Sequence, residues 1–458
     1  MQRIDTGTRR IAILTDTIRR LIHRHATVNL VKIIKKTHAA DLANVIQGLN
    51  ENDALILFEM LPTPEVAADV LSEMEESARA NFLETLSPER LSTIFQEMST
   101  DDAAQILEEI EDEERKNQIL EMMKEEDSDI VEELLSYGEN TAGRIMNPDF
   151  VALPKATEAG DAIRELRKAS ETEMVFYVYV TNEDRRLDGV ISLRDLVTVP
   201  PETILQDIMN TEVVSVEAHE DQEEVARLVA RYNLLAIPVV DAERRLIGIV
   251  TVDDVVDVMR DEATEDILKM VGTTEEEITA ASPLRSIRIR LPWLFVAWFG
   301  GVVASRVIQH FHEAIGQVTA LAAFIPVVVG MGGNIGIQSA SITVRGLATN
   351  RLESHHILSH VAKETIIGLF LGLLYGVLLG VAGALLSWGE PDAVQFGVAV
   401  GLGMLSSMLL ASFLGSFMPL FLHRLGLDPA IAGGPFVTTT IDILGVAAYF
   451  LIATAILL

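Results

Sequence analysis

The sequence has no cysteine among its 458 residues, which excludes disulfide bonds, thiolate metal sites and cysteine nucleophiles. It is also poor in basic residues, because 36 lysines and arginines stand against 67 acids and leave a net charge of −31. Such a charge repels nucleic acid and attracts cations, so we expect no nucleic-acid partner and consider a divalent metal ion. The competing interpretation is that the acids only confer solubility. No Walker loop, nucleophile elbow or histidine-rich metal set appears, and we expect no enzyme.

The acidic charge is confined to the first part of the chain. Only seven acids and five bases follow Arg290, so residues 1–290 hold about −29 of the net charge. The first residues contain one very short apolar run and no small-residue cleavage site, which predicts no signal peptide. We therefore expect an acidic N-terminal part that stays in the cytoplasm.

Short amphipathic helices are predicted for residues 38–137, after a basic, helical arm at residues 1–37. Leucine, isoleucine and methionine recur at helical spacing, with stops and caps near Asn50, Pro62 and Ser87. This pattern is typical of an all-α superhelical domain whose apolar stripes form its core.

Residues 138–208 and 209–260 each alternate strands and helices in the order β-α-β-β-α. Each copy closes on a similar motif, GVISLRD at residues 189–195 and GIVTVDD at residues 248–254. Two copies at matching offsets resemble a tandem pair of CBS domains, which implies an α/β fold for both copies.

The end of this motif has two interpretations. In CBS domains its acid often binds the ribose of an adenine nucleotide, so the resemblance implies ATP as a ligand of Tyr177, Arg194 and Asp195. The alternative is structural, because Ser192 and Thr251 stand at strand-to-helix junctions, where a hydroxyl can cap free backbone N–H groups. The sequence alone leaves both interpretations open.

One acidic helix is predicted to connect this part to the membrane, over residues 261–290. Acids in and just before it recur at helical spacing, for example at Asp257, Glu265 and Asp266. Hard oxygen ligands without histidine or cysteine suit Mg²⁺ or Ca²⁺ and disfavour zinc or copper. An ordinary solvated acidic linker would give the same pattern and is the competing interpretation.

The C-terminal part, residues 291–458, contains five apolar stretches long enough to cross a membrane as helices. We place these spans at about residues 291–311, 317–341, 364–388, 394–421 and 431–457. Basic residues lie before the first span and in the connections after the second and fourth, whereas the other two connections lack lysine and arginine. The positive-inside rule then predicts a multi-pass protein of the plasma membrane, with a cytoplasmic N-terminus and an extracytoplasmic C-terminus.

Asp442 stands near the middle of the fifth span, where a charge costs roughly 2.5–3.5 kcal/mol and calls for a partner or a cation. The second span ends in a polar, glycine-rich stretch at residues 330–341, in which Asn334 and Gln338 offer oxygens. A carboxylate combined with amide and hydroxyl oxygens suits the passage of a hydrated hard cation. The alternative is that Asp442 only bonds a neighbouring helix and that the small residues only pack.

From about residue 38 to its end, the chain resembles the MgtE family of magnesium channels and transporters. The resemblance is carried by GGNIGIQSA at residues 332–340, PFVTTTID at residues 435–442 and TAGRIM at residues 141–146. It implies a homodimer whose pore is lined by the second and fifth spans of both subunits. It also implies negative feedback, in which cytosolic Mg²⁺ clamps the soluble domains and the connecting helix acts as a plug.

These inferences predict a multidomain chain, with a superhelical domain, tandem CBS domains, a plug helix and a five-helix transmembrane domain. Mg²⁺ is the expected substrate and regulator, Co²⁺ and Mn²⁺ are further candidate ions, and ATP is a candidate modulator. Two rival functions remain. One is a proton-coupled carrier of another cation, and the other is a nucleotide-sensing membrane scaffold that transports nothing.

The resemblance implies ligands residue by residue. Its implied pore residues are Asp442, Asn334, Gln338 and Thr438. Its implied regulatory Mg²⁺ ligands are Asp101, Asp102, Gly143, Asp221, Glu223, Ala230, Asp254, Asp257, Glu262, Glu265 and Asp266. Two positions depart from the family pattern, since Asn233 stands where some members have an acid and Gly434 where some have an asparagine.

Overall fold

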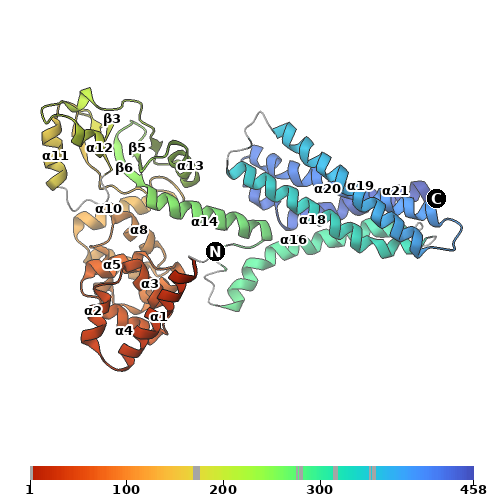
Figure 1. Cartoon of the computed structure of the whole chain (residues 1–458), viewed down its shortest axis with the longest axis horizontal. Coiled ribbons are helices and arrows are strands. Elements are labelled where there is room, and N and C mark those ends of the chain that lie inside the picture. Colours follow the sequence, from red (N-terminus) through yellow and green to blue (C-terminus); the bar gives the residue numbers. More distant parts are fainter. Residues whose placement is uncertain are drawn as a thin grey trace. The chain divides into compact units, whose positions relative to one another are not determined.

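The structure, a computed structural model, describes residues 4–168, 176–274, 277, 282–312, 318–349, 352 and 357–457. The chain divides into two compact units, residues 1–261 and 262–458, and the division falls inside helix α14 (Val252–Val271). Figure 1 shows the elements of both units. The soluble unit (1–261) and the membrane unit (262–458) each have a hydrophobic core of their own.

The soluble unit begins with short helices that follow one another closely and stack in a superhelix (Figure 1). Their bounds are α1 Ile4–His23, α2 Thr27–Ile34, α3 Ala39–Gln47, α4 Glu51–Glu59, α5 Pro64–Ser72, α6 Glu76–Thr85, α7 Pro88–Phe95, α8 Thr100–Glu108, α9 Glu113–Met122 and α10 Glu125–Ser136. The all-α superhelical domain predicted from the sequence is confirmed.

Local sequence explains where these helices begin. Pro64 and Pro88 occupy first helical positions, where no N–H is needed. The hydroxyls of Thr63 and Ser87 just before them each accept a backbone N–H of the first turn. The predicted arm at 1–37 packs with the later helices, because Ile18 and Leu30 belong to the same buried cluster.

Two three-stranded sheets follow, one in each CBS copy. The first contains β1 (Ala152–Pro154), β2 (Tyr177–Thr181) and β3 (Leu187–Ser192), and the second contains β4 (Val216–Glu217), β5 (Ala236–Val240) and β6 (Leu246–Thr251). In each sheet the first two strands are parallel and the last two antiparallel. The helices of the two copies are α11 (Ala159–Lys168), α12 (Leu193–Thr198), α13 (Gln222–Tyr232) and α14, with a 3-10 turn η1 (Leu205–Asp207) between α12 and β4. The repeated β-α-β-β-α order is confirmed.

The glycine of each repeated motif is required by a close approach. A Cβ on Gly189 would lie 2.7 Å from the sulfur of Met209, and one on Gly248 would lie 2.6 Å from the sulfur of Met146. In each copy a methionine therefore packs against the third strand: Met209 follows β3 in the chain, and Met146 precedes β1. This gives a structural role to Met146, the last residue of the TAGRIM motif.

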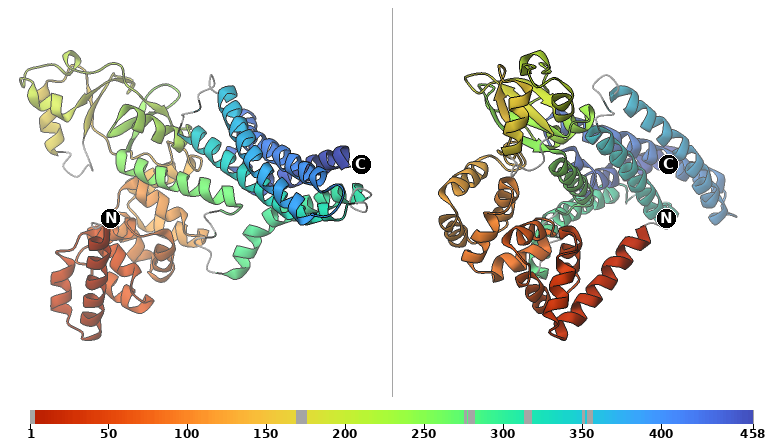
Figure 2. Two further views of the ribbon diagram at one scale, coloured as in Figure 1. Left: turned by 45° about the vertical axis from the view of Figure 1, so that its right-hand side comes forward. Right: turned by 60° about the vertical axis from the view of Figure 1, so that its left-hand side comes forward.

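Among the residues that the structure describes, the membrane unit contains five helices that are long and apolar enough to cross a bilayer. They are α16 (Pro283–His310), α18 (Ala320–Ala348), α19 (Ile357–Leu386), α20 (Ala393–Arg424) and α21 (Pro435–Leu457), with a short 3-10 helix η2 (Pro429–Ala432) before the last. They run alongside one another as a bundle in Figure 1 and in both views of Figure 2. The prediction of five spans is confirmed, although the bounds differ: α19 begins seven residues earlier and α21 four residues later than the apolar stretches that indicated them.

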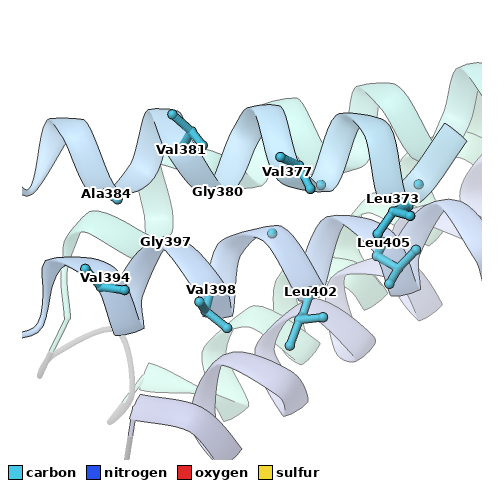
Figure 3. A pocket seen from close by; sticks show the side chains of 13 residues that line it. Leu373, Val377, Gly380, Val381, Ala384, Val394, Gly397, Val398, Leu402 and Leu405 are labelled. Carbon is cyan, nitrogen blue, oxygen red and sulfur yellow. The ribbon is translucent and has the colours of Figure 1, made fainter. Parts of the chain in front are cut away.

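Glycines bring α19 and α20 into backbone contact. A Cβ on Gly376 would lie 2.6 Å from the carbonyl oxygen of Gly401, and one on Gly380 would lie 2.7 Å from that of Gly397. Beside this crossing lies a hollow of about 350 Å³ whose lining is almost entirely apolar, with Val377 and Leu405 among its walls (Figure 3). Because it offers no polar side chain, the hollow is no candidate for an ion site.

The prediction of one helix over residues 261–290 is wrong. Helix α14 begins earlier, at Val252, and ends at Val271, after which Gly272 adopts a positive φ of 79° that favours glycine. A new helix, α16, begins at Pro283, and the Ser282 hydroxyl caps it. Residues 275–276 and 278–281 lie outside the described residues. The three arginines expected in the connecting helix therefore belong to the first turns of α16.

Candidate functional site

The carboxylate of Asp442 lies in the middle of α21, half-buried on a helix without any other charged residue. In the part of the chain that the structure describes, no hydrogen bond or ion pair reaches it. The alternative that Asp442 is merely bonded to a neighbouring helix is therefore not supported within one chain. An unpaired acid at this depth is costly and needs an ion, water or a second subunit.

The other implied pore residues lie on two helices that pack against each other. Asn334 and Gln338 are one turn apart on α18 and both are exposed. The opposite face of α18 packs against α21, since a Cβ on Gly336 would lie 2.1 Å from the Cδ1 of Ile441. Thr438 lies one turn before Asp442, and its hydroxyl donates to the carbonyl of Pro435 at 3.2 Å. The four residues thus share two adjacent helices, but within the described part of the chain no hydrogen bond joins them to one another.

A second group of implied ligands joins the superhelical domain to the second CBS copy, inside the soluble unit. Asp101 and Asp102 occupy the first turn of α8, and Asp101 is 9% exposed. The side-chain amide of Asn147 donates to Asp101 at 3.3 Å. Asp102 lies close enough to Asp254 and Asp257 of α14 to raise the pKa of both. The fold therefore brings together acids that are about 150 positions apart.

Asp254 is hydrogen-bonded to Thr251 at the start of its own helix, α14. The backbone N–H of Thr251 donates to its carboxylate at 3.3 Å, and the Thr251 hydroxyl donates to it as well. Burial, reinforced by the charges of Asp253 and Asp102, raises the pKa of Asp254 to about 7. Burial also raises the pKa of Asp257. Among the described residues, however, no three histidine, aspartate or glutamate side chains converge closely enough to hold a metal ion.

A third group surrounds the start of α13. The N–H of Gly143 donates to the carbonyl of Ala218 at 2.8 Å, and a Cβ on Gly143 would lie 2.7 Å from the ring of Tyr137. Asp221 caps α13 by accepting the N–H of Glu223 at 2.8 Å. These implied ligands lie near one another, because a backbone bridge pairs Asp221 with the TAGRIM segment. Ala230 lies farther along α13 and is exposed.

The departure at Asn233 has a structural explanation. This residue ends α13 in the left-handed conformation, with a φ of 52°. Asparagine tolerates that conformation better than most side chains. Its presence is therefore explained by the helix end alone.

The last implied ligands lie on the part of α14 that belongs to the membrane unit. Glu262 is half-buried there. The ammonium of Lys269 lies 2.5 Å from Glu265 and 2.6 Å from Asp428, which caps η2. Burial and the nearby charge of Asp428 raise the pKa of Asp266. Sequence reasoning missed Lys269 and Asp428, because nothing in the sequence indicates that η2 and the end of α14 are neighbours.

Gly434 lies where the segment after η2 contacts the end of α14. A Cβ there would lie 2.8 Å from the carbonyl oxygen of Met270, near the end of α14. A side chain as large as asparagine does not fit while α14 ends in this place. Close packing against Met270 thus explains why glycine stands at position 434, the second departure from the family pattern.

The candidate nucleotide residues are spread over one CBS copy. The Ser192 hydroxyl accepts the N–H of Asp195 at 3.1 Å and donates to its carboxylate at 2.6 Å. The capping interpretation is therefore confirmed for Ser192. The Tyr177 hydroxyl accepts the N–H of Leu235 at 3.4 Å, and Arg194 is exposed.

Another residue that sequence reasoning missed is Glu364, a buried acid in α19 that is 4% exposed. The third apolar stretch begins at Glu364, so the sequence places this acid at the end of a span. The structure extends α19 back to Ile357 and thereby buries it. The available signal was His360 four residues earlier, since two titratable groups at this spacing share a helix face.

Comparison with known proteins agrees with this domain order. The family model of the MgtE divalent cation transporter matches residues 325–452, that of the MgtE intracellular N domain matches residues 37–140, and that of the CBS domain matches residues 142–202 and 205–261. The magnesium transporter MgtE of Bacillus subtilis is 39% identical over 323 residues, covering 70% of this chain and 71% of the relative. That of Thermus thermophilus is 40% identical over 327 residues, covering 71% and 72%.

Solved structures resemble the soluble part. A crystal structure of the cytosolic domain of the Mg²⁺ channel MgtE in complex with ATP is 38% identical, with a TM-score of 0.51, and covers 53% of this chain and 99% of that one. The soluble part of a magnesium transporter is 32% identical, with a TM-score of 0.51, and covers 55% and 99%. The fold, the five membrane helices and these relatives agree, and the chain belongs to the MgtE family of magnesium transporters.

Proposed function

We propose that this chain lets Mg²⁺ into the cell through the plasma membrane and that cytosolic Mg²⁺ closes the path. The observation that carries the proposal is Asp442, an acid in the middle of a membrane helix that no described residue pairs with. An intramembrane acid of this kind marks an ion path. Co²⁺ and Mn²⁺ are further candidate ions, since they also accept oxygen ligands.

The proposed pore belongs to a homodimer. Asn334 and Gln338 are exposed on α18 although they are polar and lie in a membrane helix. Exposed amides are unfavourable against lipid, so a second copy that faces them around a water-filled path would satisfy them. Mg²⁺ sheds water reluctantly, and two Asp442 carboxylates would therefore hold it through its hydration shell.

The proposed gate is built from the acids on both parts of α14. Asp254 and Asp257 face Asp102 in the soluble unit, and their charges repel without a cation. In the membrane unit the end of α14, the proposed plug, packs at Gly434, just before α21 begins. Mg²⁺ that binds only the closed arrangement shifts the population toward it.

ATP is proposed as a modulator at the first CBS copy. The support is the repeated motif and the solved relative that contains ATP. Arg194 is exposed and able to meet phosphate, whereas Asp195 would have to exchange its bond with Ser192 for one with the ribose.

The proposed orientation places the soluble unit in the cytoplasm. Arg285, Arg288 and Arg290 lie in the first turns of α16, and Arg345 and Arg424 lie in the last turns of α18 and α20. With five spans, these ends all fall on one side of the membrane, and basic residues favour the cytoplasmic side. The C-terminus would then lie outside.

The experiment is Mg²⁺ uptake into proteoliposomes that contain the purified protein, with Mg²⁺ varied on the face of the soluble unit and no pH gradient. We expect uptake down the Mg²⁺ gradient and its inhibition by Mg²⁺ on that face. Uptake that requires an imposed proton gradient would favour the carrier instead. No uptake under any condition, together with nucleotide binding, would favour the scaffold.

A further inference from the structure

Glu364 of α19 is hydrogen-bonded by two other membrane helices. Its Oε2 accepts the hydroxyl of Ser339 on α18 at 3.0 Å, and its backbone carbonyl accepts the hydroxyl of Ser412 on α20 at 2.8 Å. All three residues are buried, with exposed fractions of 4%, 2% and 0%. One residue of α19 therefore connects to two neighbouring helices in the interior of the membrane unit.

A second polar contact joins α18 to α19 one turn away. The Thr343 hydroxyl lies 2.9 Å from Nε2 of His360 and donates its proton to the carbonyl of Ser339 at 2.7 Å. Since that proton is used, Nε2 of His360 is the donor in the contact between the two side chains. Ser339 and Thr343 lie on one face of α18. Their hydrogen bonds hold that face against the face of α19 that carries His360 and Glu364.

The central part of α18 packs differently on its different sides. Gly330 and Gly333 have open space where a Cβ would be, whereas Ile441 of α21 fills the space beside Gly332 and Gly336. Interlocking side chains of this kind fix the rotation of a helix in a bundle. Toward α19 the two hydrogen-bonded contacts add to that constraint.

We propose that Glu364 is a positioning residue that fixes the rotation of α18 through Ser339 and so aims Asn334 and Gln338 at the ion path. Gln338 precedes Ser339 directly, and the two point to different sides of the helix, one exposed and one buried. A rotation that breaks the Ser339 contact turns Gln338 away by the same angle. That Glu364 affects Mg²⁺ transport rests on the proposed function. That Glu364 fixes the rotation of α18 does not depend on the proposed function.

The test uses the absence of cysteine from the chain. Gln338→Cys places a single thiol on the exposed face of α18, and its rate of reaction with a charged, water-soluble methanethiosulfonate is measured in the full-length protein in liposomes. In a Glu364→Ala background we expect the rate to change by roughly tenfold. Glu364→Gln keeps the acceptor and should leave the rate within about twofold of the parent.

Ser339→Ala removes the donor instead of the acceptor and should give the same change as Glu364→Ala. It keeps the test usable if Glu364→Ala does not fold. The matched control is Glu390→Ala, which removes an acid that is exposed in the connection between α19 and α20. This control should leave the rate unchanged.

An unchanged rate in both alanine backgrounds would overturn the positioning role. An equal change in Glu364→Ala and Glu364→Gln would overturn it too, because the charge and not the acceptor would then matter. Mg²⁺ flux is measured in parallel on chains that keep Gln338, where Glu364→Ala should lower it and Glu364→Gln should preserve it. Absence of flux in the unmodified chain would contradict the proposed function, while the labelling rates still decide the positioning role.

Discussion

Among single residues, Asp254 shows most directly how the fold changes the chemistry of a side chain. Burial raises its pKa from the ordinary value of 3.8 to about 7, and the charges of Asp253 and Asp102 contribute. The folded protein thus keeps a proton on this carboxyl over a pH range in which the unfolded chain releases it. Mg²⁺ would have to displace that proton.

The sign of the resulting pH dependence follows from linkage. Between pH 4 and 7 the folded state binds the extra proton, so the free energy of unfolding falls by roughly 1.4 kcal/mol per pH unit as the pH rises. The contribution is fully present below pH 4 and is lost above pH 7. We expect Asp254→Asn to remove this slope from the Mg²⁺-free soluble unit, as measured by urea unfolding at several pH values.

The matched control for Asp254 is the equivalent residue of the first CBS copy. Asp195 ends the corresponding motif but is exposed, so Asp195→Asn should keep the slope. A slope that survives Asp254→Asn unchanged would show that other groups cause it.

Lone residues were the part of the site that the sequence predicted best. Asp442 could be singled out because an acid inside an apolar span is conspicuous without any structure. Asn233 could not be explained in advance, since its positive φ depends on where α13 ends. Glu364 was missed because its burial depends on how far α19 extends beyond its apolar stretch.

Among the elements, the end of α14 is tied to η2 by one lysine. Lys269 lies between Glu265 and Asp428 and is the only base within ion-pair distance of them among the described residues. Without it, these two carboxylates and that of Asp266 would repel one another. The ion pairs therefore hold the proposed plug in place even at low Mg²⁺.

Lys269→Ala should loosen that contact. A partly exposed ion pair contributes about 1 kcal/mol or less, so we expect Mg²⁺ flux at low cytosolic Mg²⁺ to rise roughly two- to fivefold. Flux into proteoliposomes is the measurement, and Lys32→Ala, which removes an exposed lysine of α2, is the control. A fall in flux, or an equal rise in both variants, would contradict the role of Lys269.

Gly434 allows a second test of the same contact. Gly434→Ala would place a Cβ 2.8 Å from the carbonyl oxygen of Met270, closer than real Cβ atoms approach, so the end of α14 has to move. We expect weaker inhibition of flux at millimolar cytosolic Mg²⁺. Gly301→Ala in α16, where the Cβ also meets open space, should leave inhibition as it is. Equal inhibition in wild type and Gly434→Ala would argue against a plug at this place.

Elements were predictable where periodicity is strong and unpredictable where a single residue breaks them. The superhelical domain, both CBS copies and the five spans follow from apolar spacing, repeated motifs and length. The break between α14 and α16 depends on the conformation of Gly272 and on the cap at Ser282. The acids at helical spacing in α14 and the arginines at the start of α16 concealed it.

At the scale of the whole molecule, the net charge of −31 is the dominant electrostatic feature. Self-repulsion of this size destabilises a compact state, and specific divalent binding relieves it more than screening does. We expect Mg²⁺ to raise the melting temperature of the full-length protein in detergent more than Na⁺ does at equal ionic strength. At one hundred times the dissociation constant, the gain is about 2.7 kcal/mol per site.

A variant separates binding from screening. Asp254→Ala combined with Asp257→Ala should remove most of the difference between Mg²⁺ and Na⁺, whereas removing two exposed acids elsewhere, Glu113 and Glu390, should not. Equal stabilisation by the two salts in the wild type would mean that the acids act only through their bulk charge.

Long-range convergence was beyond prediction from composition and spacing. Asp102 and Asp254 meet because α8 packs near the second CBS copy, and Lys269 meets Asp428 because α14 ends beside η2. These contacts depend on tertiary packing, which local patterns do not encode. The resemblance to a family indicated the acids but neither the lysine nor the buried Glu364.

The most direct test of the account is Mg²⁺ flux through Asp442→Asn in proteoliposomes, with no pH gradient. Asparagine keeps the size and the hydrogen-bonding oxygen but removes the charge that would hold a hydrated cation. The control, Asp392→Asn, removes an acid from the extracytoplasmic end of α20 as oriented here. We expect Asp442→Asn to abolish flux and Asp392→Asn to leave it near wild type. Flux through Asp442→Asn at the wild-type rate would contradict an ion path at Asp442.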